Sequence, residues 1–219
     1  MATTPDDPNL VVFDFDATIT FCDSFLPFLR FQAGRMVFWR HMLALGPDFI
    51  AWQRGKLSRE VIKEKTCIRF LAGMPETEFR QNAMRYALKH DRRLLNIKAR
   101  KQLRRHVDAG DEVVIVTASP EDMVRPFAET FGIEVIGTKL STKDGVLTGR
   151  LGSPNCRGPE KVIRLTERFG QRGQVLKAAY GDSGGDTEIL AAAEDPHYRD
   201  FRGPLFGLRS YWVLFRLLV

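Results

Sequence analysis

The stretch Leu10–Thr18 reads LVVFDFDAT, and it decides the fold. Its apolar run, rich in β-branched and aromatic residues, predicts a buried strand over Leu10–Phe15. The run ends in Asp14 and Asp16, which stand two residues apart and so share one face of an extended chain. Carboxylates placed in this way repel each other, and unpaired charges in a core are costly. A divalent cation bound by both carboxylates would remove that cost. The alternative interpretation is that both acids are exposed to water at the start of a loop.

Two further apolar runs repeat the pattern of a strand that ends beside a polar side chain. Glu112–Thr117 (EVVIVT) ends in Thr117, and Val175–Gly181 (VLKAAYG) is followed by Asp182. Helical patterns lie beside these runs, at residues 94–109, 120–131, 159–169 and 186–193. Alternating strands and helices predict an α/β fold with a parallel sheet of about five strands, covered on both faces. Ligands of such sheets bind beyond the carboxyl ends of the strands.

The connection between the first two strands is too long for a simple crossover. Asp16 and Thr117 lie about a hundred residues apart, whereas a helical crossover needs about a dozen. Residues 24–91 are rich in Phe, Leu, Met, Arg and Lys and have few strand-like runs. We therefore predict an inserted helical cap there, with its helices interrupted near Gly46–Pro47 and Gly73–Pro75.

The rest of the chain is expected to form a core from residues 1–23 and 92–204, followed by an apolar C-terminal tail, residues 205–219. Within the core, Lys143-Asp144-Gly145 lies between two apolar runs, and Asp-Gly at such a place predicts a hairpin turn. The N-terminus MATTPDDPNL has neither a basic segment nor a long apolar one, so no cleaved signal is expected. No uninterrupted apolar run is long enough for a plain membrane span.

The composition narrows the class of protein. Hydrophobic residues make up 44% and charged residues 27% of the 219 residues, which excludes disorder, collagen and coiled coil as the main class. The three cysteines include no CxxC pair, so a reducing, cytoplasmic setting is expected rather than a disulfide framework or a zinc ribbon. The formal charge of +6 favours an anionic partner: a phosphate ester, a membrane surface or a nucleic acid.

Lys161 and the segment Gly181–Asp186 add to the polar strand ends. Lys161 lies at the start of a helix that Pro159 can open. Gly181–Asp186 reads GDSGGD, a small and acidic segment that lets a metal and a ligand approach the backbone. Each feature alone has an ordinary explanation, such as a solvated Lys or an acidic turn. Their joint occurrence, in this order, supports a functional site.

These residues resemble the haloacid dehalogenase (HAD) superfamily, in the helical-cap branch IB that includes phosphoserine phosphatase and phosphatidylglycerophosphatase C. Asp14–Thr18 (DFDAT) is similar to the first motif, DxDx[TV]. Thr117, Lys161 and Gly181–Asp186 are similar to the second, third and fourth motifs. Ala17 stands where many members have Gly, which is a mild departure. The resemblance implies a Rossmann-like core with a central parallel sheet and an inserted α-helical cap of the C1 type.

The resemblance also implies a Mg²⁺-dependent phosphomonoester hydrolase. Asp14 would attack phosphorus to form an aspartyl-phosphate. Asp16 would protonate the leaving alcohol and then activate water, a role that favours phosphate esters over carbon–halogen bonds because a halide needs no proton. Two alternatives stay open: a phosphotransferase or mutase with the same nucleophile, and a non-catalytic HAD-fold protein that binds a membrane or a partner.

The family's other roles fall on matching residues of this chain. The metal would take oxygen ligands from three residues: Asp14, Asp182 and, through its backbone carbonyl, Asp16. The phosphoryl oxygens would be bound by two side chains and a backbone amide: Thr117, Lys161 and Ala118. Asp186 would support either the water shell of the metal or Lys161.

The cap is expected to select the substrate, a phosphorylated small molecule or lipid. Asp23 lies nine residues after Asp14, where phosphoserine phosphatases have a Glu that recognises the amino-acid head group of the substrate. Asp23 is therefore a candidate specificity residue, with a helix cap as the alternative. Phe25–Leu45 mixes apolar residues with Arg, which suits either a helix in the cap core or one in a membrane interface.

Location and partners are left partly open by the sequence. For the tail, residues 205–219, a membrane surface or self-association as a homo-oligomer is favoured over docking on its own domain. A cytoplasmic protein, free or peripheral to the inner face of a membrane, is expected. Lys98–Arg105 (KARKQLRR) lies on a helix with core-like apolar spacing, so no nucleic-acid partner is expected.

Overall fold

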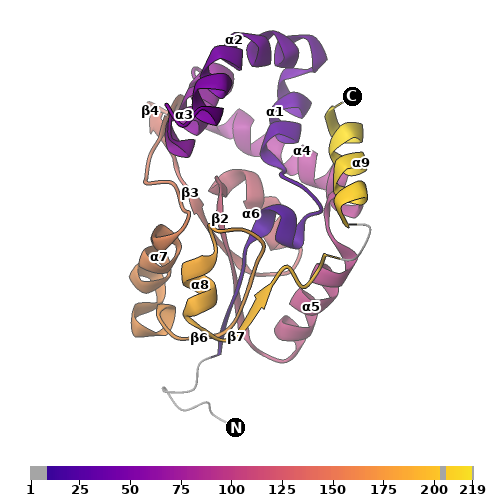
Figure 1. The fold of residues 1–219 in the computed structure, drawn as a ribbon, viewed down its shortest axis with the longest axis vertical. Coiled ribbons are helices and arrows are strands. Elements are labelled where there is room, and N and C mark those ends of the chain that lie inside the picture. The colour runs from indigo at the N-terminus through magenta and orange to yellow at the C-terminus, as the bar shows by residue number, and fades with distance from the viewer. Residues whose placement is uncertain (1–8, 203–205, 219) are drawn as a thin grey trace.

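The computed structural model describes residues 9–202 and 206–218. A five-stranded sheet lies in the lower part of the molecule in Figure 1, in the order β3-β2-β1-β6-β7, and all neighbouring strands are parallel. Its strands are β1 (Leu10–Phe13), β2 (Glu112–Pro120), β3 (Glu134–Thr138), β6 (Leu176–Gly181) and β7 (Ala193–Tyr198). The predicted α/β fold with a central parallel sheet is confirmed.

Helices flank this sheet, as the alternation of strands and helices predicts. They are α5 (Ile97–Asp108), α6 (Glu121–Glu129), α7 (Pro159–Phe169) and α8 (Thr187–Ala191), with the short turns η1 (Phe15–Ile19) and η2 (Gly170–Gly173). Alternate residues of β1 enter two different apolar clusters: Val11 and Phe13 join the larger one, and Leu10 and Val12 join the smaller one. The central strand is therefore buried on both faces, which explains its continuous apolar run.

The helical cap predicted between the first two strands is present above the sheet in Figure 1. It consists of α1 (Phe25–Ala33), α2 (Arg35–Gln53), α3 (Arg59–Leu71) and α4 (Glu76–Leu94). The segments that enter and leave the cap lie side by side. The amide of Phe21 donates to the carbonyl of Leu94 (2.9 Å), and the amide of Asn96 donates to the carbonyl of Ile19 (2.7 Å). Helix α4 continues three residues past the predicted limit at residue 91. The exact division of the chain into core and cap stays a prediction.

One predicted helix break is wrong. The break expected at Gly46–Pro47 does not occur, because α2 runs through both residues, and the chain turns instead at Gly34, between α1 and α2. Gly34 has a φ of +75°, which glycine adopts without a steric penalty. Pro47 is exposed, so water can reach the carbonyl that loses its amide partner there. The break predicted at Gly73–Pro75 is confirmed.

The hairpin predicted at Asp144-Gly145 is confirmed. Strands β4 (Leu140–Lys143) and β5 (Val146–Leu151) pair antiparallel across it. Its two turn residues have φ values of +53° and +76°, as a type I′ turn requires. Strand β5 packs against α3, and the backbone of Leu147 exchanges hydrogen bonds with Gly73 and Met74. The hairpin therefore lies against the cap, although the sequence grouped it with the core.

The C-terminal helix α9 (Phe206–Leu218) packs against α1. Val213 and Leu217 are buried in the larger apolar cluster, whereas Leu208 and Tyr211 are exposed. The preference for a membrane or a second copy over docking is therefore wrong for the buried face of this helix. Within the described ranges, no helix combines the length and apolar character that crossing a membrane requires. Residues 1–8 of the segment examined for a signal, and residues 205 and 219 of the tail, lie outside those ranges.

Candidate active site

Asp14 directly follows β1 and lies at the carboxyl edge of the sheet, where this fold binds ligands. Its Oδ1 accepts a hydrogen bond from Nζ of Lys161 (2.7 Å), and its Oδ2 accepts one from the hydroxyl of Thr18 (3.4 Å). Burial raises the pKa of Asp14 to about 7 although Lys161 opposes the rise, and the neighbouring Asp186 and Asp16 contribute to it. Asp14 is thus a buried carboxyl whose charge needs a nearby cation.

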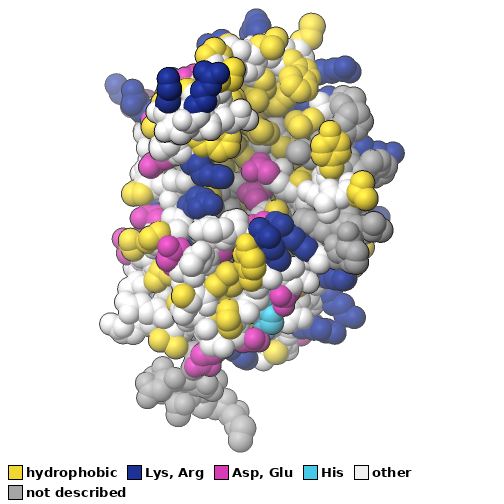
Figure 2. All heavy atoms as spheres, viewed as in Figure 1, with side chains coloured by type: hydrophobic (Ala, Val, Ile, Leu, Met, Phe, Trp, Pro, Cys, Tyr) yellow, Lys and Arg dark blue, Asp and Glu magenta, His cyan; other side chains and the backbone are white. Residues whose placement is uncertain are grey.

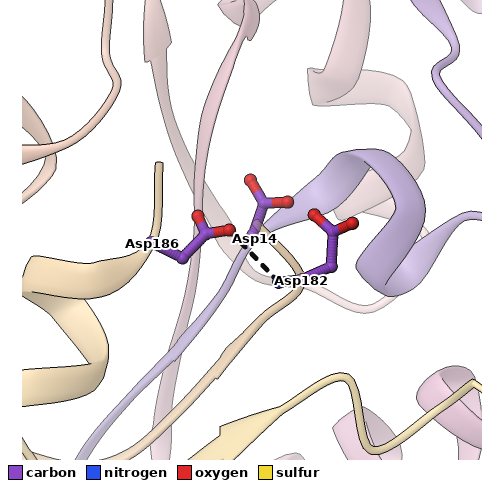
Figure 3. A group of neighbouring side chains, drawn as sticks. All are labelled: Asp14, Asp182 and Asp186. Carbon is purple, nitrogen blue, oxygen red and sulfur yellow. Dashed lines mark hydrogen bonds between the residues drawn. The ribbon is translucent and has the colours of Figure 1, made fainter. Parts of the chain in front are cut away.

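Three carboxylates from two separate segments converge at this edge of the sheet (Figure 3). Asp14 follows β1, Asp182 follows β6 and Asp186 precedes α8, and each offers an oxygen within 4.8 Å of the others. All three residues are buried, and three carboxylates outnumber the two cations that pair with them, Lys161 and Arg202. Hard oxygen donors with excess negative charge fit Mg²⁺.

Lys161, in the first turn of α7, is buried among these acids. Its ammonium donates to Oδ1 of Asp14 (2.7 Å), to Oδ1 of Asp186 (2.7 Å) and to the carbonyl of Val116 (2.8 Å). Burial alone would lower the pKa of Lys161, but the two carboxylates raise it above its ordinary value. Lys161 therefore stays charged beside the predicted nucleophile.

The segment Gly181–Asp186 folds tightly around the carboxylate of Asp186. Its Oδ2 accepts hydrogen bonds from the amides of Asp182 (3.1 Å, the dashed line in Figure 3) and Ser183 (3.0 Å), and from the hydroxyl of Ser183 (3.0 Å). A Cβ at Gly181 would lie 2.5 Å from Cβ of Asp186, so the loop requires glycine there. Burial opposes ionisation, but Lys161 and these donors lower the pKa of Asp186. The loop thus holds Asp186 as an ionised support for Lys161.

Asp182 has partners that the sequence analysis missed. Arg202 forms an ion pair with Oδ2 of Asp182, and Nε of Arg199 donates to the carbonyl of Asp182 (2.9 Å). Burial raises the pKa of Asp182, and Arg202 opposes that rise. Both arginines follow β7 without any motif around them, so no sequence pattern could have identified these contacts.

Thr117 and Asp16 are connected through Ser119, another residue that the sequence analysis missed. Oγ1 of Thr117, in β2, accepts a hydrogen bond from the amide of Ser119 (3.0 Å). Oγ of Ser119 donates to Oδ2 of Asp16 (2.5 Å), and the amide and hydroxyl of Ser24 donate to Oδ1 of Asp16 (2.7 and 2.6 Å). The Asp16 side chain is therefore held at the junction with the cap, outside the group of three carboxylates.

A cavity of about 420 Å³ between cap and core connects these groups. All the site residues predicted from the sequence line it: Asp14, Asp16, Asp23, Thr117, Ala118, Lys161, Asp182 and Asp186. The cap adds an apolar wall from α1, α2 and α3: Phe25, Leu26, Phe49, Trp52 and Ile62. Acidic side chains reach the surface midway between the upper and lower parts of the face shown in Figure 2. The structure thus brings together side chains that are far apart in the sequence.

Asp23 and Ala118 have further contacts at this cavity. Oδ1 of Asp23 accepts a hydrogen bond from the amide of Phe25 (3.0 Å), so Asp23 caps α1 and also lines the cavity. The carbonyl of Ala118 accepts a hydrogen bond from Nζ of Lys63, on α3. Lys63 was also missed, because nothing in its local sequence indicates that a cap lysine reaches the core.

Comparison with known proteins identifies the family. The model of the haloacid dehalogenase-like hydrolases matches residues 11–191. Protein CicA of Caulobacter vibrioides is 43% identical over 204 residues, which cover 90% of this chain and 88% of CicA. A histidinol-phosphatase of Neisseria meningitidis serogroup C is 33% identical over 99 residues, which cover 42% of this chain and 44% of that protein.

The fold comparison agrees with the sequence comparison. A solved structure of phosphoserine phosphatase, in the form of a phospho-aspartyl intermediate analogue, superposes with a TM-score of 0.61, covering 93% of this chain and 91% of that one. Its sequence identity is 19%, so this likeness concerns the fold alone. Since the family match extends from β1 into α8, the chain belongs to the haloacid dehalogenase-like hydrolases.

Proposed function

We propose that this protein is a Mg²⁺-dependent phosphomonoester hydrolase with Asp14 as its nucleophile. The main support is the hydrogen bond from Lys161 to Asp14 (2.7 Å) within a group of three buried carboxylates. A carboxylate attacks a phosphate dianion poorly unless nearby charge is neutralised. Lys161 supplies one positive charge, and the carboxylate group offers a place for a divalent ion.

The proposed reaction has two steps. An oxygen of Asp14 attacks phosphorus while the bond from phosphorus to the leaving alcohol breaks, and Asp16 gives its proton to the alkoxide. Water then attacks the aspartyl-phosphate, Asp16 takes a proton from the water, and the bond from phosphorus to Asp14 breaks, which releases inorganic phosphate. The hydrogen bonds from Ser24 and Ser119 would orient Asp16 for both proton transfers.

The groups around Asp14 have distinct proposed roles. Mg²⁺ would be held by Asp14, Asp182 and the backbone carbonyl of Asp16, and when bound it would neutralise charge on the phosphoryl group. The phosphoryl oxygens would be bound by Thr117, Lys161 and the amide of Ala118. The many hydrogen bonds to Asp186 favour a supporting role for it over direct ligation.

Hydrolysis of p-nitrophenyl phosphate with and without Mg²⁺ tests this proposal. We expect Asp14→Asn to reduce turnover by at least about 10³-fold, because an amide cannot form the covalent intermediate. Asp195→Asn, at a side chain that is 71% exposed, is the matched control and should leave turnover unchanged. Circular dichroism should show that both variants are folded. Full activity in Asp14→Asn would contradict the nucleophile assignment.

The products and a substrate panel separate the remaining alternatives. Transfer of phosphate to added glycerol instead of water would favour a phosphotransferase, and the absence of turnover with every ester would favour a non-catalytic protein. The panel consists of phosphoserine, histidinol phosphate, sugar phosphates and phosphatidylglycerophosphate. The apolar wall of the cavity favours an ester whose alcohol has an apolar part.

We also propose that the outward face of α2 contacts an anionic membrane surface. Met36, Trp39, Leu43 and Ile50 recur at helical spacing and are 86%, 45%, 78% and 49% exposed. Arg35 and Arg40 are exposed on the same helix. Hydrophobic and basic side chains occur together at the upper end of the molecule in Figure 2, where Figure 1 places α2. Apolar and basic residues on one helix suit the interface of an anionic bilayer.

The acidic residue of α2 does not oppose this contact. Asp48 is paired with Lys65 of α3 at 2.6 Å, so its charge is locally balanced. Phe49 and Trp52, near the end of the same helix, line the cavity. A membrane in contact with the outward face of α2 would therefore lie close to the apolar wall of the proposed site.

Vesicle co-sedimentation tests the membrane contact. We expect binding to vesicles of phosphatidylglycerol and phosphatidylcholine, weaker binding to phosphatidylcholine alone, and loss of binding in the double variant Met36→Ser, Leu43→Ser. Leu88→Ser on α4, at a side chain that is 77% exposed, is the matched control and should bind normally. Failure of the wild-type protein to bind, or a dimer in solution that the double variant abolishes, would contradict the proposal.

A further inference from the structure

We propose that Lys63, on cap helix α3, is a positioning residue that couples the placement of the cap to the geometry of Thr117 and Asp16. This inference rests on the proposed function, because it gives Lys63 a role in the same reaction. Lys63 lines the cavity together with both of these residues.

The ammonium of Lys63 bridges three separate segments of the core. It donates to the carbonyl of Ala118 in β2, to Oγ1 of Thr138 at the end of β3 (2.9 Å) and to Oδ1 of Asn155 in the loop before α7 (2.6 Å). An ammonium has three protons, so all of its donors are used. Lys63 thus has no hydrogen bond left for a substrate in this arrangement, and its contacts indicate that it holds the core.

The contact with Ala118 reaches the predicted reactive groups through one peptide unit. The carbonyl of Ala118 and the amide of Ser119 belong to the same planar peptide, so they are oriented together. That amide donates to Oγ1 of Thr117 (3.0 Å), and Oγ of Ser119 donates to Oδ2 of Asp16 (2.5 Å). The same carbonyl accepts a hydrogen bond from the hydroxyl of Thr138 (2.7 Å), whose oxygen Lys63 also contacts. Removing the ammonium would therefore loosen both Thr117 and Asp16 without touching either side chain.

The electrostatics of Lys63 suit a contact between the cap and the core. All three acceptors of Lys63 are neutral, so its charge is stabilised by dipoles at hydrogen-bond distance. Burial lowers the pKa of Lys63 to about 8, while the groups that face it raise it: Cys67, Cys156, Asp16 and Asp23. The fully protonated ammonium is present below that pH, and one of its three donors is lost as the pH rises through it.

The decisive variant is Lys63→Met, which keeps an unbranched side chain as far as Cε and removes the charge and the donors of Nζ. We expect kcat for p-nitrophenyl phosphate to fall by about 10- to 100-fold, the size expected for misplaced catalytic groups, with KM changed much less. The matched control is Lys65→Met on the same helix, at a lysine that is 44% exposed and pairs only with Asp48 among the described residues. Its kcat should equal that of the wild type.

Two readouts separate positioning from a general loss of structure. Hydrogen exchange should become faster over residues 117–120 and over α3 in Lys63→Met, and it should stay unchanged in Lys65→Met. The wild-type kcat should decline as the pH rises through about 8, and this decline should be absent from Lys63→Met. Normal kcat, or reduced kcat with unchanged exchange over residues 117–120, would overturn the inference. If the wild type hydrolyses no phosphate ester, the proposed function fails, while the exchange experiment still tests the contact.

Discussion

Ala17 occupies a backbone conformation that few residues other than glycine adopt. Its φ of 59° and ψ of 6° lie in the left-handed region, which costs a residue with a side chain about 1–2 kcal/mol. This conformation turns the chain directly after Asp16, and the amide of Ala17 donates to Oγ1 of Thr20 (3.0 Å). The strain therefore lies beside the proposed general acid, at the position where many members of the family have Gly.

Ala17→Gly should stabilise the protein by about 0.5–1 kcal/mol, because relief of the left-handed strain exceeds the entropic cost of glycine in the unfolded chain. Urea unfolding measures this change. The same substitution at Ala44, which is exposed within α2, should instead destabilise the protein by about 1 kcal/mol. Equal destabilisation by the two substitutions would show that Ala17 is unstrained.

At the same scale, the proposed site divides into residues that sequence reasoning can find and residues that it cannot. Asp14 and Asp182 directly follow apolar strands and Thr117 ends the apolar run of β2, and the edge of a parallel sheet brings such positions together. Lys63 and Ser24 reach the site from the cap. Their contacts depend on where the cap lies on the core, and no local sequence pattern contains that information.

At the scale of the elements, apolar runs in the sequence predict the buried strands well but do not reveal the exposed ones. Strands β1, β2 and β6 have nearly continuous buried runs, which distinguishes them from their surroundings. Strand β7 reads AEDPHY and is mostly exposed at the edge of the sheet, where a proline needs no ladder partner on its open side. Its sequence therefore has none of the features that mark a central strand.

The misplaced helix break in the cap has a similar origin. Judged locally, Gly46–Pro47 is a stronger break signal than the single Gly34. The packing of the cap decides otherwise, because α2 places residues on both sides of this point against the domain: Leu45 before it is buried, and Phe49 and Trp52 after it line the cavity. The turn at Gly34 allows α1 and α2 to pack against each other. Tertiary contacts thus override the local preference.

At the scale of the whole molecule, the cap is tied to the core by contacts of different kinds. Ser24 and Lys63 provide polar contacts at the cavity. The helix α9, which follows the core in sequence, packs against α1 of the cap. An element from the end of the chain therefore spans the two parts, and its burial should stabilise their arrangement as well as the fold.

The double variant Val213→Ala, Leu217→Ala tests this role of α9. Both side chains are buried in the larger apolar cluster, so their truncation should lower the free energy of unfolding by about 3–5 kcal/mol, measured by urea denaturation. Leu208→Ala on the same helix, at a side chain that is 73% exposed, should change it by less than about 0.5 kcal/mol. If α9 served only a membrane or a second copy, the double variant would unfold at the same urea concentration as Leu208→Ala. A clear difference between them would mean that this apolar segment is part of the domain's own core.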